Sequence, residues 1–205
     1  MKSMIITLDG PSGVGKTTIG KRLASELDLD FFSSGMLYRA IAAHFNSKGV
    51  TTINEIQITS RDPVNCLIDG ETYIEDQLYS SEINDKSSEI AQLLEVRNIV
   101  SNVLHFLSTS SSNGLVVEGR DMGSVVFRDA DLKIYLNASE NTRSKRRLIQ
   151  SGSNESIEDI RNRDARDTNR KISPLVIPNE ALVINNENMT IDEIIMLIKE
   201  NLKLQ

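Results

Sequence analysis

The sequence is poor in cysteine: Cys66 stands alone among 205 residues, and tryptophan is missing altogether. A single cysteine excludes a disulfide within the chain and a metal site built from cysteine pairs. This usage is typical of proteins that work in a reducing compartment, so we expect a cytoplasmic protein. Cys66 lies in a short apolar run, where it is expected to be a small buried hydrophobic side chain rather than a reactive thiol.

Long apolar runs and excess positive charge are also missing. No apolar run approaches the roughly 18 residues that a membrane span requires, and we expect neither a membrane segment nor a signal peptide. The formal net charge is −6, which argues against nonspecific binding to nucleic acid. An anionic ligand would therefore be held by a local cluster of basic side chains. The length allows one well-packed core with a small insert.

A phosphate-binding loop is present near the N-terminus. Residues 10–17 read Gly-Pro-Ser-Gly-Val-Gly-Lys-Thr, between an apolar run at 4–9 and a helical pattern at 16–27. This order lets backbone N–H groups and the positive end of a helix dipole face phosphate oxygens. Lys16 is expected to reach the β- and γ-phosphates of a nucleoside triphosphate, and the Thr17 hydroxyl to bind magnesium. The alternative is a glycine-rich turn into an ordinary helix.

Strand and helix patterns alternate along the chain. Further apolar runs occur at 30–33, 115–118, 132–136 and 181–184. Helical patterns occur at 16–27, 36–47, 89–109, 140–150, 156–170 and 190–203. This alternation predicts an α/β fold of the P-loop NTPase type, with a five-stranded parallel sheet and helices on both faces. Ligands of such sheets bind beyond the carboxyl ends of the strands.

One segment interrupts the alternation. Residues 64–68 and 72–75 are β-type runs around Asp69-Gly70, and Asp-Gly between such runs is a strong hairpin signal. We therefore predict a small inserted subdomain at about 50–86. The core would then comprise residues 1–49 and 87–205.

Arginines follow two of the predicted strands. Arg120 and Asp121 come after the run at 115–118, and Arg39 comes shortly after the run at 30–33. Side chains at these positions should neighbour the phosphate loop, where guanidinium groups bind phosphate well. Taken singly, each arginine is as readily a partner in a surface ion pair.

Two later helical patterns carry further charge. The first, at 140–150, has a basic run that includes Arg143, Arg146 and Arg147. The second, at 156–170, places Arg163, Asp167 and Arg170 on one helix face. Mobile arginines that close over a triphosphate stabilise phosphoryl transfer and exclude water. The alternatives are a solvated face for the first group and a surface helix pair for the second.

In its motifs the chain resembles the bacterial cytidylate kinases, which are nucleoside monophosphate kinases, over nearly its whole length. The resemblance rests on the phosphate loop with the preceding Asp9, Ser34-Gly-Met-Leu-Tyr-Arg39, Val96-Arg97, Glu118-Gly-Arg-Asp-Met-Gly-Ser-Val-Val-Phe127 and Arg163-Asp-Ala-Arg-Asp-Thr-Asn-Arg170. The Gly-Arg-Asp-Met-Gly segment and the Arg/Asp helix are the most specific of these. One departure is Ser33, where the family usually has aspartate.

The resemblance implies roles for the matching residues. ATP and magnesium would be held by the loop residues Gly10, Ser12, Gly13, Val14, Gly15, Lys16, Thr17 and Thr18, with Thr17 as the metal ligand. The catalytic set would be Lys16 with three ligands of the acceptor phosphate, Arg39, Arg120 and Arg170. The ribose hydroxyls would be bound by Arg163 and Asp167. The cytosine and its surroundings would be contacted by Ser34, Ser88, Arg97 and Asp121. Residues 142–160, with Arg143, Arg146 and Arg147, would form a lid, and the insert would be the monophosphate-binding subdomain.

The sequence therefore predicts a kinase that moves the γ-phosphoryl group of ATP onto CMP and dCMP. Asp121 would accept a hydrogen bond from the N4 amino group of cytosine and would face an acceptor in uracil. Ser88 has a plain alternative role, as the N-cap of a helix that begins near Glu89. A kinase for another small acceptor, and a nucleotide-binding regulatory module without turnover, are the alternatives in function. We expect only small-molecule partners, no nucleic acid, no membrane, and a monomer.

Overall fold

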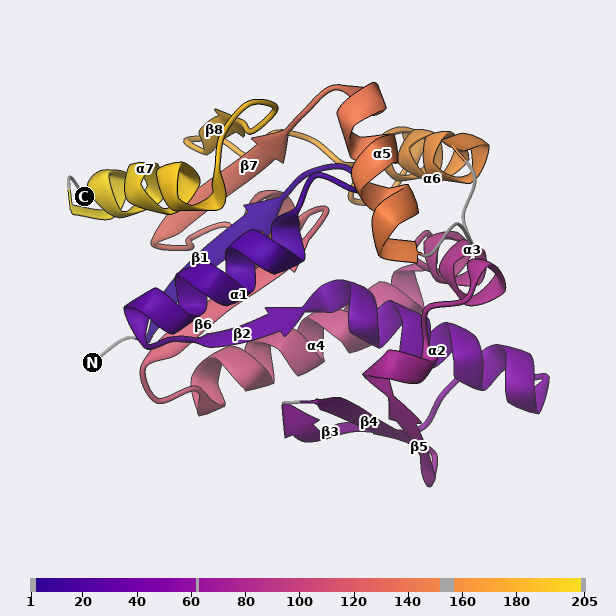
Figure 1. Ribbon diagram of the computed structural model, residues 1–205. Coiled ribbons are helices and arrows are strands. Elements are labelled where there is room, and N and C mark those ends of the chain that lie inside the picture. The colour runs from indigo at the N-terminus through magenta and orange to yellow at the C-terminus, as the bar shows by residue number, and fades with distance from the viewer. Residues whose placement is uncertain (1–2, 62, 152–156, 204–205) are drawn as a thin grey trace. The chain divides into compact units, whose positions relative to one another are not determined.

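The computed structural model describes residues 3–61, 63–151 and 157–203, and the chain divides into two compact units (Figure 1). Unit 1 comprises Met1–Ser33 and Leu107–Gln205, and unit 2 comprises Ser34–Phe106. The predicted insert at 50–86 lies inside unit 2, and its own boundaries stay a prediction. Within the described ranges, every helix is too short or too polar to cross a membrane.

Unit 1 is built on a five-stranded parallel sheet, which confirms the predicted fold. The strands are β1 (Met4–Asp9), β2 (Asp30–Ser33), β6 (Gly114–Gly119), β7 (Leu132–Asn137) and β8 (Leu182–Asn185), in the order β2-β6-β1-β7-β8. The register places Asp9 opposite Gly119 and Tyr135, and Ser33 opposite Glu118. The carboxyl ends of the strands therefore meet at one edge of the sheet, where a ligand is expected.

The α-helices that lie wholly in unit 1 are α1 (Lys16–Leu27), α5 (Glu140–Ser151), α6 (Ile157–Asn169) and α7 (Ile191–Lys203), and the short helical segment η2 (Met122–Val126) follows β6. In Figure 1, α1 and α7 lie on the same side of the sheet and contact each other. Leu23 of α1 and Ile198 of α7 are fully buried in a core that also contains Ile6 and Leu8 of β1. This apolar packing holds the first turn of α1 at the carboxyl end of β1.

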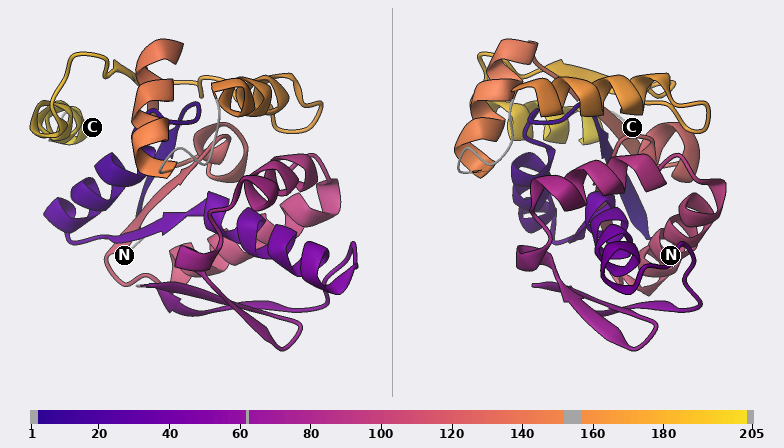
Figure 2. Two further views of the ribbon diagram at one scale, coloured as in Figure 1. Left: turned by 45° about the vertical axis from the view of Figure 1, so that its right-hand side comes forward. Right: turned by 90° about the vertical axis from the view of Figure 1, so that its right-hand side faces the viewer.

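The described residues of unit 2 form one antiparallel sheet, a short 3-10 turn and three α-helices. Its strands are β3 (Ile56–Arg61), β4 (Val64–Ile68) and β5 (Glu71–Ile74), followed by the short turn η1 (Glu75–Gln77). Its helices are α2 (Ser34–Lys48), α3 (Ser81–Ile90) and α4 (Leu94–Ser110), of which the last four residues belong to unit 1. Figure 2 shows α2 lying along the sheet, and α2 contacts β4 and β5. The hairpin predicted around Asp69-Gly70 is confirmed, with positive φ at both residues.

The helix predicted at 89–109 is wrong, because the structure has two helices there. The first helix, α3, ends at Ile90, and α4 begins at Leu94. Ser88 consequently lies in the last turn of α3 and is not an N-cap. The cap of α3 is Ser80, whose hydroxyl accepts a hydrogen bond from the N–H of Ile83 at 3.1 Å. The other predicted helices agree with the structure to within two residues at each end.

Candidate active site

The phosphate loop is held against neighbouring backbone where only glycine fits. Gly10 has φ of 147°, and a Cβ there would overlap the carbonyl oxygen of Leu136 at the end of β7. Gly13 has φ of 72°, and a Cβ there would overlap the carbonyl oxygen of Arg143 in α5. Both φ values lie in the region that favours glycine. The sequence pattern is therefore explained by close approach as well as by chain reversal.

The loop ends at the open N-terminus of α1. Gly15 is the N-cap and has no side chain with which to cap the helix, and the N–H of Ile19 bonds to the Gly15 carbonyl at 3.0 Å. The N–H groups of Lys16, Thr17 and Thr18 belong to the first turn and have no intrahelical acceptor. Together with the helix dipole, they form a site suited to an anion.

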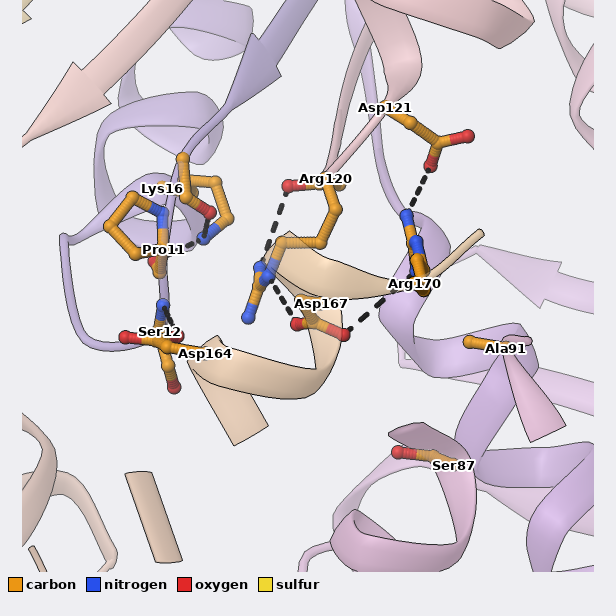
Figure 3. Close-up of polar contacts among 12 residues, drawn as sticks. Pro11, Ser12, Lys16, Ser87, Ala91, Arg120, Asp121, Asp164, Asp167 and Arg170 are labelled. Atoms are coloured by element: carbon orange, nitrogen blue, oxygen red, sulfur yellow. Dashed lines mark hydrogen bonds and ion pairs between the residues drawn. The ribbon is translucent and has the colours of Figure 1, made fainter. Parts of the chain in front are cut away.

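Lys16 is buried and folds back over the loop. Its Nζ donates to the carbonyl oxygens of Gly10 and Pro11, both at 2.8 Å (Figure 3). Burial, and next the positive charge of Arg120, hold the pKa of Lys16 well below its ordinary value. An arriving phosphate would supply the negative charge that favours the ammonium form.

Thr17 and two acidic side chains meet at the carboxyl ends of β1 and β6. The Thr17 hydroxyl donates to Oε1 of Glu118 at 2.7 Å. The second oxygen of Glu118, Oε2, is buried and has no hydrogen-bond partner among the residues that the structure describes. Asp9 accepts from the N–H groups of Met122 and Gly123 at 2.9 and 2.8 Å. Burial raises the pKa of Asp9 to about 6.

Arginine and aspartate side chains form a network after β6 and along α6 (Figure 3). Arg120 donates through Nε to Oδ2 of Asp167 at 2.9 Å. Arg170 lies 3.9 Å from Asp167 and 3.4 Å from Asp121. Burial alone would raise the pKa of Asp167, but the charges of Arg120, Arg163 and Arg170 outweigh it and lower the pKa. The structure thus brings together five residues that the sequence singled out.

A second set of contacts joins α5 and α6 to the phosphate loop. Asp164 accepts from the N–H of Ser12 at 2.9 Å and also pairs with Arg143. Arg143 donates in addition to the carbonyl oxygens of Ser12 and Ala138, at 2.9 and 3.2 Å. Arg143 is buried, so the solvated-face alternative does not hold for it. The side chain of Arg147 lies outside the described part of the chain.

In unit 2, Arg39 projects from α2 onto a tyrosine. Its guanidinium carbon lies 4.4 Å from the centre of the Tyr79 ring, and Nη2 donates to the Tyr79 hydroxyl at 3.2 Å. That hydroxyl donates to Oε1 of Glu75 at 2.8 Å. The Arg39 Nε is buried and finds no acceptor within the described ranges. An arginine with a spare donor and a stacked face is suited to an anionic ligand.

The other predicted residues of unit 2 are all buried. Ser34 opens α2, Ser88 lies in α3 and Arg97 lies in α4. Arg97 donates through Nη1 to the Ala91 carbonyl at 3.0 Å, and its guanidinium carbon lies 5.9 Å from the ring centre of Tyr38. This contact fixes Arg97 at the turn between α3 and α4. The roles predicted for these three residues stay predictions.

Sequence reasoning gave no role to four side chains that the structure places at these clusters. They are Glu118, Asp164, Tyr79 and Asn186, whose side chain donates to the Val14 carbonyl of the phosphate loop at 2.7 Å. Two signals were available, because Glu118 ends a predicted strand and Asn186 follows one, both at the ligand-binding edge. Asp164 and Tyr79 gave no such signal, because neither follows a predicted strand.

The chain matches known proteins over nearly its whole length. The family model described as cytidylate kinase matches residues 6–204. A cytidylate kinase of Clostridioides difficile (strain 630) is 34% identical over 219 residues, covering 100% of both chains. One of Streptomyces avermitilis is 35% identical, covering 94% of this chain and 90% of that one. Among solved structures, shikimate kinase from Bacteroides thetaiotaomicron superposes with a TM-score of 0.53 at 15% identity, covering 98% of each chain. The protein TT1252 from Thermus thermophilus gives 0.56 at 15% identity, covering 100% of both. These two structural likenesses show the fold alone.

Proposed function

The chain belongs to the cytidylate kinase family, and from this premise we propose that it transfers the γ-phosphoryl group of ATP to CMP and dCMP. The products are ADP and CDP or dCDP. The observation that carries the proposal is the pairing of two anion sites in unit 1. One is the open glycine loop with buried Lys16, and the other is the network of Arg120, Asp167 and Arg170.

The donor site fits a triphosphate. Uncapped N–H groups at the start of α1 and the ammonium of Lys16 supply positive charge at the carboxyl end of β1. Lys16 uses two of its three donors on loop carbonyls, so one remains for a phosphate oxygen. Because the ammonium is buried, its attraction for a phosphate is stronger than it would be in water.

The residues around Thr17 fit magnesium. Magnesium prefers hard oxygen ligands and in kinases is bound by one or two protein oxygens together with substrate phosphates. Thr17 and Glu118 present a hydroxyl and a carboxylate, and the Oε2 atom of Glu118 is buried without a hydrogen bond. The ion would neutralise charge on the transferring phosphoryl group. Asp9 lies at the end of the neighbouring strand, where its charge adds to the site.

The acceptor site is formed by guanidinium groups. Arg120 and Arg170 of unit 1 bind the phosphate of CMP, while Asp121 accepts from the cytosine amino group. The sequence motif Ser34–Arg39 assigns Arg39 to the same phosphate. No side-chain base is required, because the attacking phosphate oxygen is already anionic. The arginines and Lys16 hold the two phosphates in line and stabilise the charge of the transition state. Arg163 and Asp167 bind the ribose, Ser34, Ser88 and Arg97 surround the base, and α5 with α6 forms the lid.

The test is an ADP-release assay with CMP, dCMP, UMP, AMP and GMP as acceptors. We expect turnover with CMP and dCMP well above the others. Lys16→Ala should lower kcat by orders of magnitude, while Lys21→Ala, which removes an exposed lysine of the same helix, should leave it unchanged. A preference for UMP or AMP would favour the alternative that the protein phosphorylates an acceptor other than CMP. ATP binding without CMP-dependent ADP release would favour a regulatory module and overturn the proposal.

The working state is also part of the proposal. We infer a cytoplasmic monomer with ATP and CMP or dCMP as its partners, since a single buried cysteine suits a reducing compartment. Light scattering coupled to size-exclusion chromatography tests the monomer. A mass near twice 22.8 kDa would overturn it.

A further inference from the structure

Asn186, the first residue after β8, is a buried junction between the phosphate loop and α5. Its side-chain Nδ2 donates to the carbonyl oxygen of Val14 at 2.7 Å, and its Oδ1 accepts from Nη1 of Arg146 at 3.0 Å. Arg146 Nη2 also donates to the Asn186 carbonyl at 3.1 Å. The backbone N–H of Asn186 donates to the carbonyl oxygen of Asn137 at 2.9 Å. Because arginine only donates and a carbonyl only accepts, the two ends of the amide cannot be exchanged.

The bond to Val14 fixes the rotation of one peptide group in the loop. In a planar trans peptide the C=O and N–H bonds point in opposite directions. With the Val14 oxygen held by Asn186, the N–H of Gly15 is directed away from Asn186. Gly15 has φ of 94° and no Cβ, so steric hindrance resists rotation of this peptide less than at other residues. The hydrogen bond from Asn186 therefore supplies the restraint that the glycine itself lacks.

The bond to Arg146 ties α5 to the same junction. Two nitrogens of the guanidinium contact two oxygens of one residue, which sets the position of the side chain as a bidentate pair does. The next residue, Glu187, accepts from the Ser139 N–H at 2.8 Å and from the Thr142 hydroxyl at 2.7 Å. Residues 186 and 187 thus anchor both the start and the middle of α5.

We propose that Asn186 is a positioning residue for the donor nucleotide: it aims the Gly15 N–H at the phosphates and holds Arg146 beside the loop. The inference rests on the proposed function. Loss of the amide frees the Val14–Gly15 peptide and the guanidinium together. Donor binding is then weakened while acceptor binding is retained, because Asn186 has no described contact with the arginine–aspartate network.

The experiment measures the Kd of ADP and of CMP by calorimetry, together with Tm, for Asn186→Ala, Asn186→Asp and Arg146→Ala. We expect Asn186→Ala to weaken ADP about tenfold, the loss of one well-placed hydrogen bond, and to change CMP less than about twofold. The aspartate of Asn186→Asp still accepts from Arg146 but cannot donate to Val14. Its second carboxylate oxygen instead faces the Val14 carbonyl oxygen. This variant should weaken ADP at least as much as Asn186→Ala. The double variant Asn186→Ala with Arg146→Ala should lose less than the product of the single effects, since both act through one junction.

Asn113→Ala is the matched control, because Asn113 is an exposed asparagine at the opposite, amino-terminal edge of the same sheet. It should leave both Kd values unchanged. A residue with a merely structural role would lower Tm and weaken ADP and CMP alike, and that result overturns the proposal, as do unchanged ADP affinities in both Asn186 variants. If the unmodified protein binds no ADP, the proposed function fails and this inference falls with it. If the unmodified protein binds ADP and CMP and phosphorylates CMP, a negative result for the Asn186 variants overturns the role of Asn186 and leaves the proposed function intact.

Discussion

Arg120 and Asp167 form an ion pair that is largely withdrawn from solvent. The Nε–Oδ2 distance is 2.9 Å, and the side chains are 17% and 6% exposed. Asp167 also lies within 3.9 Å of Arg170, which pairs with Asp121 as well, so one carboxylate is shared between two guanidinium groups proposed to bind the acceptor phosphate. The carboxylate keeps these arginines ordered in the absence of a ligand and competes with the incoming phosphate for them.

Replacing Asp167 by Asn should lower the free energy of unfolding by about 3 kcal/mol, because it removes the carboxylate bonded to Arg120 and leaves Arg170 with Asp121 as the other described acidic neighbour in this network. Inorganic phosphate should raise the Tm of this variant more than that of the unmodified protein, since the anion takes the place of the lost carboxylate. Thermal denaturation with and without phosphate measures both effects. Asp192→Asn removes the same charge at a side chain that is 86% exposed and should change neither quantity. If phosphate raises Tm equally in Asp167→Asn and in the unmodified protein, the anion does not take the place of the lost carboxylate.

Replacing Asp121 by Asn tests whether this side chain distinguishes cytosine from uracil. Asp121 is 2% exposed and lies 3.4 Å from Arg170, so the variant also loosens Arg170 and should raise KM for every acceptor. The diagnostic quantity is the ratio of kcat/KM for CMP to that for UMP. It should fall at least about tenfold, because the variant loses a charged acceptor for the N4 amino group and gains a donor for uracil. Asp167→Asn is the control, and it should weaken both acceptors by similar factors. An unaltered ratio in Asp121→Asn would show that Asp121 does not discriminate between CMP and UMP.

The sheet and the loop could be predicted from the sequence because their signals are local. Residues 10–17 form one contiguous motif, and the strand before it and the helix after it follow the two periodicities that sequence patterns report. The carboxyl-edge rule then placed Arg120 and Asp121 correctly without any knowledge of strand order. Asp167 and Arg170 were predicted to lie together because residues three apart share one face of a helix, which is again a local signal.

Partners far apart in the sequence could not be predicted. Thr17 and Glu118 are separated by 101 residues, and Val14 and Asn186 by 172. These pairs meet because β6 and β7 flank β1 and β8 lies beyond β7, an order that alternation alone leaves open. The break between α3 and α4 was missed because Ala91–Leu93 contains neither glycine nor proline and the apolar spacing continues across it. Strand β3 was missed although apolar Ile56 and Ile58 alternate there with polar Gln57 and Thr59, which is the pattern of a half-buried strand.

Removing the Tyr79 side chain should weaken CMP binding through Arg39. Stacking at a partly exposed site contributes about 0.5–1 kcal/mol, so Tyr79→Ala should raise KM for CMP about two- to fivefold. Tyr79→Phe keeps the ring but loses the hydroxyl that Arg39 and Glu75 share, and should raise it about twofold. Steady-state kinetics with each substrate varied in turn measure the effect, and KM for ATP should stay constant. Tyr73→Phe removes the hydroxyl that contacts His44 and serves as the matched control. A shift of both KM values in Tyr79→Ala would assign Tyr79 to folding of unit 2 instead.

Asp9 should make stability depend on pH with the sign opposite to that of most carboxylates. Its pKa is about 6 in the folded chain against an ordinary 3.8, so the folded state holds the proton more tightly than the unfolded state. The contribution of Asp9 to the free energy of unfolding is therefore complete below about pH 4 and is lost as the pH rises through about 6. The difference between the two pKa values corresponds to about 3 kcal/mol. Asp9→Asn has no such titration and retains one carbonyl oxygen for the N–H groups of Met122 and Gly123.

Urea denaturation of both proteins between about pH 4 and pH 7.5 measures this dependence. The stability of the unmodified protein minus that of Asp9→Asn should fall by about 3 kcal/mol as the pH rises, and should level off above about pH 7. Groups that titrate equally in both proteins cancel in the difference, so Asp9 alone determines its shape. Parallel stability curves would show that the two backbone N–H groups compensate fully for burial of the carboxylate. In that case Asp9 is ionised throughout this range, and its negative charge is already present at the magnesium site in mildly acidic solution.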